Sequence, residues 1–188
     1  VLISDEIYDK LSLETDEKTP SIASLAPDLP TITLNGLSKS YLVPGWRLGW
    51  VTVSGEKESL KPYIDTMHKL LRTRLSANHA EQYAIPAALN GSQLHLVEMR
   101  RKLRSRRDLV VRKFRNVPGL DLKPPRAAFY AFPRIQISGE DKAFALKLLR
   151  DTGVLVVPGS GFGEKEYTNH FRLVYLPDEE QLEEALEK

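Results

Sequence analysis

Residues 35–50, NGLSKSYLVPGWRLGW, decide the fold that this sequence predicts. The stretch lies between two short apolar runs, 31–34 and 48–53, whose β-branched composition is typical of strands. Lys39 therefore lies on a loop just past a strand that we expect to be buried. Because desolvation disfavours the charged form of a lysine, an amine in such a position can attack a carbonyl carbon and form a Schiff base.

Arg47 adds a second functional group to the same loop. It follows Lys39 by eight residues, and Pro44 and Gly45 mark a turn between them. A guanidinium group keeps its charge and can bind a phosphate through two parallel hydrogen bonds. A Schiff-base lysine paired with a phosphate-binding arginine suggests pyridoxal 5'-phosphate (PLP) as the cofactor.

The composition excludes several other kinds of chemistry. The 188 residues carry a net charge of +2, which favours no acidic partner, and no cysteine, which excludes disulfides and thiolate catalysis. The histidines do not recur at the spacing of metal ligands, so we expect no metal site; they are His68, His79, His95 and His170. The length allows one large domain or two small ones.

No segment predicts a membrane protein or a secreted one. No apolar run is long enough to span a bilayer, and the chain does not open with a signal peptide. We therefore expect a soluble, cytoplasmic protein without a membrane partner. The first residue is Val1 and it opens an apolar run, so we expect the sequence to be the interior of a longer polypeptide.

The pattern of apolar residues predicts a mixed α/β chain. Helical spacing or propensity marks residues 57–74, 77–89, 98–115, 142–152 and 178–188. Short apolar runs predict strands at residues 1–4, 31–34, 48–53, 127–132, 154–157 and 171–175. The change to short strands after the long basic helix predicts a second, smaller domain that begins near residue 96.

Asp5 and Tyr8 follow the first predicted strand, at the end where open α/β sheets bind their ligands. Taken alone, Asp5 is best interpreted as a helix N-cap or a loop carboxylate. The functional alternative is that Asp5 faces a cationic partner while Tyr8 presents its hydroxyl group from the same turn.

Residues 98–115 form the most basic segment, with nine lysines or arginines and two acids. Nucleic-acid binding is one interpretation of this charge. The one aromatic residue of the segment, Phe114, falls on the apolar stripe that occupies one face of the predicted helix, so no ring is left among the charges for base stacking. A solvated amphipathic helix is therefore favoured, and we expect no nucleic-acid partner.

Two features lie near the end of the chain. The glycine-rich residues 159–163 suggest a phosphate-binding loop, but they lack its spacing, and a tight turn is the better interpretation. Arg172 lies within an apolar strand, where a structural salt bridge is the ordinary explanation. The functional alternative is that its guanidinium group binds a carboxylate with two hydrogen bonds.

Five motifs in this order resemble the class I/II, fold-type I aminotransferases, and they cover nearly the whole chain. The segments are DEIY at 5–8, SK at 38–39 with GWRLG at 45–49, AAFY at 127–130, PG at 158–159 with FG at 162–163, and FRL at 171–173. They are similar to the family's D-E-x-Y segment, lysine loop, G-A-F-Y strand, P-G-x-x-F-G turn and R-[LI] strand. Ala127 stands where glycine is usual, which affects only the local backbone conformation.

The resemblance implies catalytic roles for three residues. Lys39 would hold PLP as a Schiff base and then move a proton between the substrate Cα and the cofactor C4′. Asp5 would pair with the pyridine nitrogen and keep it protonated. Tyr8 would donate a hydrogen bond to the 3′ oxygen of the cofactor.

The resemblance also implies roles in binding. Arg47, helped by Ser38, would bind the cofactor phosphate, and Arg172 would bind the α-carboxylate of the substrate. The implied architecture is a large domain with a mostly parallel sheet and flanking helices, followed by a small α+β domain. Residues 1–95 would be the later part of the first, and residues 96–188 would be most of the second. A homodimer is implied as well.

Residues 35–41 and 74–78 are most similar to alanine aminotransferases. The expected reaction converts L-alanine and 2-oxoglutarate to pyruvate and L-glutamate. Aspartate or aromatic aminotransferases are alternatives, as are a PLP-dependent lyase or synthase and the ligand-sensing domain of a transcription regulator with this fold. The family's other cofactor contacts precede its D-E-x-Y segment, so we expect a C-terminal half that alone binds PLP poorly and does not turn over.

Overall fold

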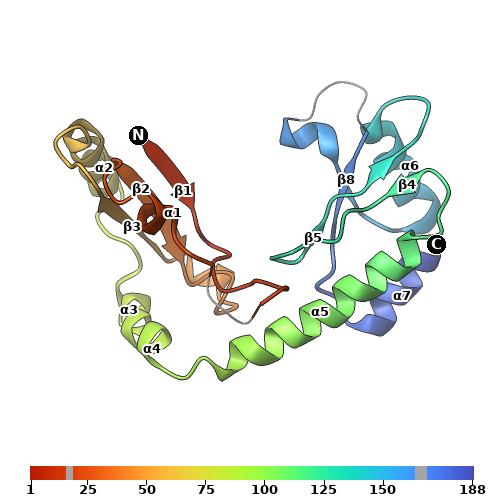
Figure 1. The fold of residues 1–188 in the computed structure, drawn as a ribbon, viewed down its shortest axis with the longest axis horizontal. Coiled ribbons are helices and arrows are strands. Elements are labelled where there is room, and N and C mark those ends of the chain that lie inside the picture. Colours follow the sequence, from red (N-terminus) through yellow and green to blue (C-terminus); the bar gives the residue numbers. More distant parts are fainter. Residues whose placement is uncertain (16–18, 164–168) are drawn as a thin grey trace. The chain divides into compact units, whose positions relative to one another are not determined.

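The computed structural model describes residues 1–15, 19–163 and 169–188 of the chain. These residues form two compact units, Val1–Val97 and Glu98–Lys188. Both units contain helices and strands, so the predicted mixed α/β class is confirmed (Figure 1). Within the described ranges, no helix is both long enough and apolar enough to cross a membrane.

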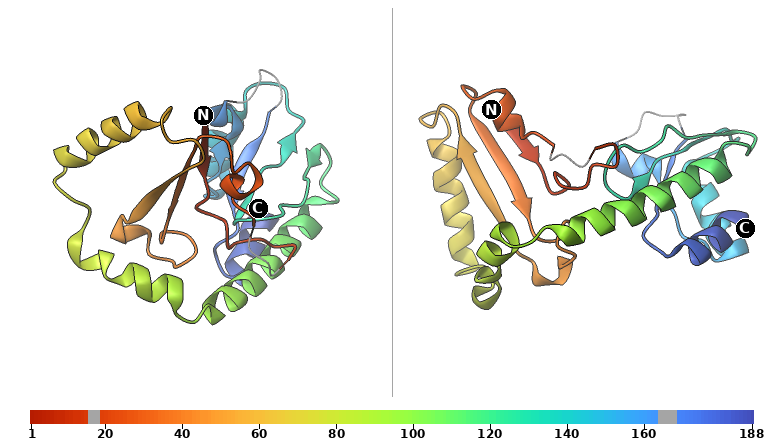
Figure 2. Two further views of the ribbon diagram at one scale, coloured as in Figure 1. Left: turned by 60° about the vertical axis from the view of Figure 1, so that its left-hand side comes forward. Right: turned by 60° about the horizontal axis from the view of Figure 1, so that its bottom comes forward.

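The first unit is built on a three-stranded sheet with the strand order β1-β2-β3. The strands are β1 (Leu2–Asp5), β2 (Thr31–Gly36) and β3 (Gly49–Ser54). β1 runs parallel to β2, whereas β3 runs antiparallel to it (Figure 2, right-hand view). The mostly parallel sheet that was expected is therefore only partly found. β2 and β3 are joined directly by a loop of twelve residues, 37–48, and a short direct connection turns the chain back on itself.

Two facing glycines close the base of this connection, which we call the lysine loop (residues 37–48). Gly36 pairs with Gly49 across β2 and β3. A Cβ atom on Gly36 would lie 2.7 Å from the carbonyl oxygen of Leu48, and one on Gly49 would lie 2.8 Å from that of Asn35. Side chains at either position would push the two strands apart, so glycine is required for this close approach.

The other elements of the first unit are helices. They are α1 (Ile22–Leu25), the 3-10 helix η1 (Pro44–Trp46), α2 (Lys61–Thr73), α3 (His79–Gln82) and α4 (Ala84–Asn90). The helix predicted at 57–74 is α2, and it begins with Pro62 in its first turn. The single helix predicted at 77–89 is two helices, and Pro86 lies in the first turn of α4, where its missing N–H costs no hydrogen bond.

The buried core of the first unit includes both ends of the lysine loop. Its apolar members are Leu11, Leu13, Ile32, Leu37, Leu48, Leu60 and Leu96. β1 contributes no residue to this core, because Ile3 is 65% exposed and the strand alternates between exposed and half-buried residues. β1 is an edge strand, and its alternate side chains point to opposite faces of the sheet.

The second unit combines a long helix with small antiparallel sheets. α5 (Leu94–Phe114) is followed by β4 (Leu120–Asp121), β5 (Tyr130–Ala131), β6 (Arg134–Ile135), α6 (Asp141–Thr152), β7 (Val157–Pro158), the 3-10 helix η2 (Gly159–Phe162), β8 (Phe171–Val174) and α7 (Glu179–Glu187). β4 pairs with β6, and β8 lies between β5 and β7. The strands predicted at 127–132 and 154–157 shrink to two residues each.

α5 is amphipathic, as its apolar spacing predicted. Leu103 and Val110, seven residues apart, are buried. One helical turn beyond Val110, the ammonium group of Lys113 lies 2.8 Å from carboxylate oxygens of both Glu183 and Glu187 in α7. Part of the basic charge of this helix is therefore neutralised within the second unit, which supports the interpretation of a solvated helix face.

Candidate active site

Asp5 and Lys39 come to the same edge of the sheet in the first unit. Asp5 is the last residue of β1 and pairs with Leu34, and Lys39 follows the end of β2 by three residues. β1 and β2 are parallel neighbours, so both residues lie beyond the carboxyl ends of adjacent strands, which is where open α/β sheets bind ligands. The topology thus brings together two of the residues that the sequence predicted.

Asp5 is solvent-exposed and is ordered by its own backbone. One of its carboxylate oxygens accepts a hydrogen bond from the N–H of Ile7 at 3.2 Å. This contact is the one expected for a loop carboxylate, and it occupies only one of the two oxygens. Asp5 can therefore keep this backbone contact and still accept a hydrogen bond from a cationic ring nitrogen.

Glu6 holds the turn that carries Asp5 and Tyr8, and sequence reasoning gave it no role. One of its carboxylate oxygens accepts hydrogen bonds from Ser21 Oγ at 2.8 Å and from the N–H of Ile22 at 3.0 Å. The same oxygen accepts one from Ser4 Oγ at 3.1 Å. Glu6 thereby ties the end of β1 to the start of α1. In the sequence, its position within the DEIY segment is the one signal that could have indicated a role for Glu6.

Lys39 lies half-buried in a tightly turned part of the lysine loop. The N–H of Tyr41 donates to the carbonyl of Leu37 at 3.2 Å, and the N–H of Leu42 donates to the carbonyl of Lys39 at 3.3 Å. Leu37 and Ser40 are buried at 1% and 2% exposure, so the backbone on both sides of Lys39 is anchored. Ser38 and Tyr8 are also half-buried.

Arg47 ends the 3-10 turn η1 in a left-handed backbone conformation, with φ at 53°. Its side chain is exposed, and Nη1 donates to the carbonyl of Pro44 at 3.1 Å. Asn78 supports this turn, because its Nδ2 donates to the carbonyl of Trp46 at 2.8 Å while its Oδ1 accepts from Arg74 at 3.0 Å. In the sequence, residues 74–78 were noted only for their similarity to alanine aminotransferases. In the structure, Arg74 and Asn78 form hydrogen bonds that support the turn carrying Arg47.

A cavity of about 450 Å³ opens beside the lysine loop. Its polar lining comes from neighbours of the predicted residues, among them Glu6, Lys10, Asn35, Ser40 and Tyr41. The predicted residues Asp5, Tyr8, Lys39 and Arg47 are not part of this lining. The cavity is therefore separate from the site that these four residues would form.

Arg172 lies on β8 of the second unit, half-buried between two aromatic rings. Its guanidinium carbon is 4.4 Å from the ring centre of Phe162 and 4.6 Å from that of Tyr130. Among the described residues it forms no ion pair, and its Nε is buried without a hydrogen-bond partner. Within that part of the chain the salt-bridge explanation finds no support, and the geometry fits a cation that is held flat with donors left for a ligand.

The turn at residues 158–163 holds Phe162 against Arg172. The buried carboxylate of Asp141 accepts hydrogen bonds from the N–H of Ser160 at 2.6 Å and from Ser160 Oγ at 2.8 Å. A carboxylate in this position repels a phosphate and occupies a backbone donor that a phosphate would use. The tight-turn interpretation of this glycine-rich segment is therefore preferred over a phosphate-binding loop.

The AAFY segment places its strain one residue later than the sequence suggested. Ala128, not Ala127, has a left-handed backbone, with φ at 61°. The buried hydroxyl of Tyr175 donates to the carbonyl of Ala128 at 3.3 Å and so supports this conformation. Burial raises the pKa of Tyr175, which keeps the phenol protonated as a donor.

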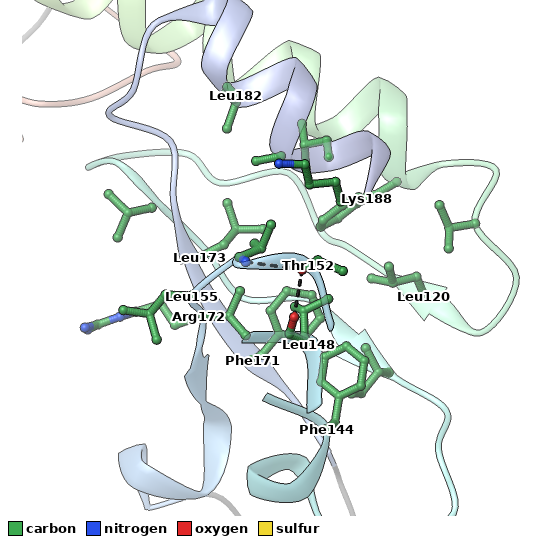
Figure 3. Close-up of a pocket in the computed structure, with 18 of the residues that line it drawn as sticks. Leu120, Phe144, Leu148, Thr152, Leu155, Phe171, Arg172, Leu173, Leu182 and Lys188 are labelled. Atoms are coloured by element: carbon green, nitrogen blue, oxygen red, sulfur yellow. Dashed lines mark hydrogen bonds between the residues drawn. The ribbon is translucent and has the colours of Figure 1, made fainter. Parts of the chain in front are cut away.

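A larger apolar cavity of about 1070 Å³ lies in the second unit among α6, β8 and α7 (Figure 3). Apolar side chains such as Leu148, Phe171 and Leu182 line it. Arg172 also lines it, but its guanidinium group stacks on Phe162 and Tyr130, neither of which belongs to the lining. This cavity is therefore distinct from the carboxylate site that was predicted at Arg172.

The fold and these residues define the class of the protein. The family model "Aminotransferase class I and II" matches residues 1–188, so the chain belongs to this family, whose members depend on PLP.

Particular relatives narrow the comparison to alanine aminotransferases. The chain is 41% identical over 201 residues to "Glutamate-pyruvate aminotransferase AlaA" of Haemophilus influenzae, covering 100% of this chain and 48% of that protein. It is 39% identical over 194 residues to "Alanine aminotransferase" of Mycobacterium tuberculosis, covering 100% of this chain and 45% of that protein. The chain thus spans about half the length of the curated relatives it matches.

A solved structure supports the same grouping. The alanine aminotransferase from Pyrococcus furiosus superposes with a TM-score of 0.90 at 41% identity, over 98% of this chain and 47% of that one. The fold described above is therefore that of about half of such an enzyme.

Proposed function

We propose that this chain provides the cofactor-binding lysine and the carboxylate-binding arginine of a PLP-dependent transaminase. The observation that carries the proposal is the placement of Asp5 and Lys39 beyond the carboxyl ends of two adjacent parallel strands. When bound, PLP supplies an electron sink that stabilises negative charge on the substrate Cα. The chain's own residues bind, orient and move protons around it.

Three residues of the first unit would act near the cofactor ring. Lys39 Nζ would bond covalently to the cofactor and later move the proton that leaves the substrate Cα. The second carboxylate oxygen of Asp5 would accept a hydrogen bond from the protonated pyridine nitrogen and hold that proton in place. The hydroxyl of Tyr8 would donate a hydrogen bond to the 3′ oxygen.

The phosphate would be bound by Arg47 with help from Ser38. Within the described residues, Arg47 uses Nη1 for the carbonyl of Pro44, and its other guanidinium nitrogens remain as donors at an exposed position. This donor set fits a phosphate, because a guanidinium group can present two parallel N–H groups to two oxygens.

Arg172 would bind the substrate α-carboxylate. The rings of Phe162 and Tyr130 hold its guanidinium plane, and Nε is a buried donor with no partner among the described residues. A carboxylate that accepts from Nε and a terminal nitrogen would satisfy this donor and fix the direction of the substrate Cα–H bond.

The substrates that fit the relatives best are L-alanine and 2-oxoglutarate, with aspartate or aromatic donors as the alternatives. Residues 1–95 would belong to the cofactor-binding domain and residues 96–188 to the small domain. By itself the chain would bind PLP weakly and would not turn over. The complete enzyme would be a homodimer.

A hybrid enzyme tests this function. In it, this chain replaces the matching segment of the aminotransferase AlaA from Haemophilus influenzae, and the 2-oxo acid formed from each amino-acid donor (pyruvate from L-alanine) is measured with and without 2-oxoglutarate. We expect turnover that requires the 2-oxo acid and is higher with L-alanine than with L-aspartate or L-tyrosine. Product formation without a 2-oxo acid would favour a lyase instead. A Lys39→Arg hybrid, expected to be inactive, is the matched control.

A further inference from the structure

The lysine loop is held by side chains from a segment far away in the sequence. Lys10 Nζ donates hydrogen bonds to the hydroxyl of Tyr41 at 2.6 Å and to Gln93 Oε1 at 3.3 Å. The Tyr41 hydroxyl in turn donates to Gln93 Oε1 at 3.1 Å. Three side chains from three separate parts of the first unit therefore meet at one point, two residues beyond Lys39.

His95 makes a second contact to the same loop. Its Nε2 lies 3.1 Å from the carbonyl oxygen of Ser40, and its ring centre is 5.3 Å from that of Tyr41. Because a carbonyl oxygen only accepts, this geometry requires the proton to be on Nε2. The two residues that directly follow Lys39 are thus both bound by the segment 93–95.

Gln93 is itself oriented before it reaches the loop. Its Nε2 donates to the carbonyls of Ala88 and Gly91, each at 2.9 Å, so its Oε1 is the end that faces Lys10 and Tyr41. Gly91 permits this turn, because a Cβ atom there would lie 2.4 Å from the carbonyl oxygen of Ala87. The acceptor is therefore fixed by the end of α4 rather than by the lysine loop.

We propose that Lys10, Gln93 and His95 form a clamp on Ser40 and Tyr41 that positions the amine of Lys39. These three are positioning residues, since they act on Lys39 through the backbone of its loop. The proposal rests on the proposed role of Lys39. Its physical basis is that a lysine side chain has four rotatable bonds, so its amine can be directed only if the backbone that carries it is fixed.

The variant Tyr41→Phe tests the clamp with the smallest change. It removes the hydroxyl that joins Lys10 to Gln93 and keeps the ring that contacts His95. Tyr83→Phe is the matched control, because Tyr83 also contacts a histidine ring, that of His79 at 5.4 Å, on α3 outside the lysine loop. A second pair uses Gln93→Leu, which removes the acceptor, and Gln82→Leu as its control, because Gln82 Nε2 donates to the carbonyl of Ala77 at 3.1 Å, outside the lysine loop.

The first readout is amide hydrogen exchange in the purified 188-residue chain without cofactor. The amides of Tyr41 and Leu42 form the turn around Lys39. We expect their exchange to become roughly tenfold faster in Tyr41→Phe and Gln93→Leu, with little change in Gln82→Leu and Tyr83→Phe. Amides of β2 and β3 should keep their rates. Equal exchange in all variants, or faster exchange throughout the sheet, would overturn the clamp.

The second readout separates a positioning role from a purely structural one. The chain is mixed with PLP, reduced with borohydride and digested, and the share of label on Lys39 is measured across pH. Tyr41→Phe and Gln93→Leu should lower this share, and Gln82→Leu and Tyr83→Phe should leave it unchanged. Faster exchange with an unchanged share would leave only a structural contact and overturn the positioning role. Wild-type protein without a preference for Lys39, both in this chain and in the hybrid enzyme, would instead contradict the proposed function, whatever the exchange data show.

Discussion

The lysine loop and the strand that carries Arg172 hold their key side chains in opposite ways. Around Lys39, the loop is fixed through the residues next to it. Tyr41 donates from its N–H to the carbonyl of Leu37 and from its hydroxyl to Gln93 Oε1, and His95 Nε2 donates to the carbonyl of Ser40. Around Arg172, the guanidinium group itself is fixed, by ring stacking that uses none of its donors. A nucleophilic side chain that must move during catalysis needs a fixed backbone. A side chain that binds a carboxylate needs its guanidinium group fixed, with its hydrogen-bond donors left for the ligand. Substitutions in the two regions should therefore impair the protein in different ways, most severely at Lys39.

Replacing Lys39 should have the largest effect. In the hybrid enzyme, Lys39→Ala should lower kcat by roughly 10⁴-fold, because both the covalent attachment and the proton transfer are lost. Lys57→Ala, at an exposed lysine in the same unit, should leave kcat unchanged. A Lys39→Ala hybrid that keeps more than a tenth of the activity would exclude the proposed role.

Replacing Arg172 should act on substrate binding instead. Arg172→Lys keeps the positive charge but loses the two parallel N–H donors of the guanidinium group and its stacking on the aromatic rings. KM for L-alanine in the hybrid should therefore rise roughly 10- to 100-fold, with a smaller change in kcat. Arg134→Lys, at an exposed arginine on β6, is the matched control. If both substitutions gave the same KM, the carboxylate would be bound elsewhere.

The base of the lysine loop, where Gly36 faces Gly49, should be destabilised by a single added methyl group. Gly36→Ala would place Cβ 2.7 Å from the carbonyl oxygen of Leu48, whereas Gly45→Ala meets nothing within 4 Å. We expect Gly36→Ala to lower the free energy of unfolding of the first unit by about 1–3 kcal/mol, and Gly45→Ala to change it little. Trp46 and Trp50, the two tryptophans of the chain, both lie in this unit, so fluorescence in a urea titration reports it. Equal midpoints for the two variants would mean that the strands can separate at no cost.

The smallest effect concerns the ion pairs between α5 and α7. The hydrogen bond from Lys113 lowers the pKa of Glu183 below its ordinary value. A lowered carboxylate pKa stabilises the folded state above the unfolded-state pKa, and this stabilisation is lost as the pH falls through the folded-state pKa. The second unit should therefore lose stability on acidification below about pH 4.5, slightly less steeply in Lys113→Met than in the wild type. Thermal unfolding at several pH values measures this, with Lys142→Met as the control; parallel pH curves for Lys113→Met and wild type would refute it.

Local sequence patterns predicted the elements that depend on local physics. The β-branched runs on either side of Lys39 became β2 and β3, and the apolar spacing of Leu103 and Val110 became the buried face of α5. The direction of the strands was harder to predict. A mostly parallel sheet was expected, but β3 runs antiparallel to β2 and only β1 runs parallel to it. Period-2 alternation does not encode the direction of the neighbouring strand.

Contacts between distant segments were out of reach of the sequence. Lys10, Tyr41 and Gln93 are separated by 31 and 52 positions, and none of them forms a recognisable motif with another. The pairing of Asp141 with Ser160 across 19 positions is similar. The candidate residues at 5, 8, 39, 47 and 172 were found from their residue types together with the family resemblance, and Ser38 was found from the resemblance alone. The side chains that hold them became visible only once the chain was folded.

Reductive labelling of the chain with PLP and borohydride, followed by peptide mapping, shows directly which lysine forms the Schiff base. We expect Lys39 to take up more label than any other lysine, even if the total is small, and Lys39→Arg to remove this preference. Label spread over exposed lysines such as Lys57 to the same extent as on Lys39, both in this chain and in the hybrid enzyme, would contradict the proposed role of Lys39.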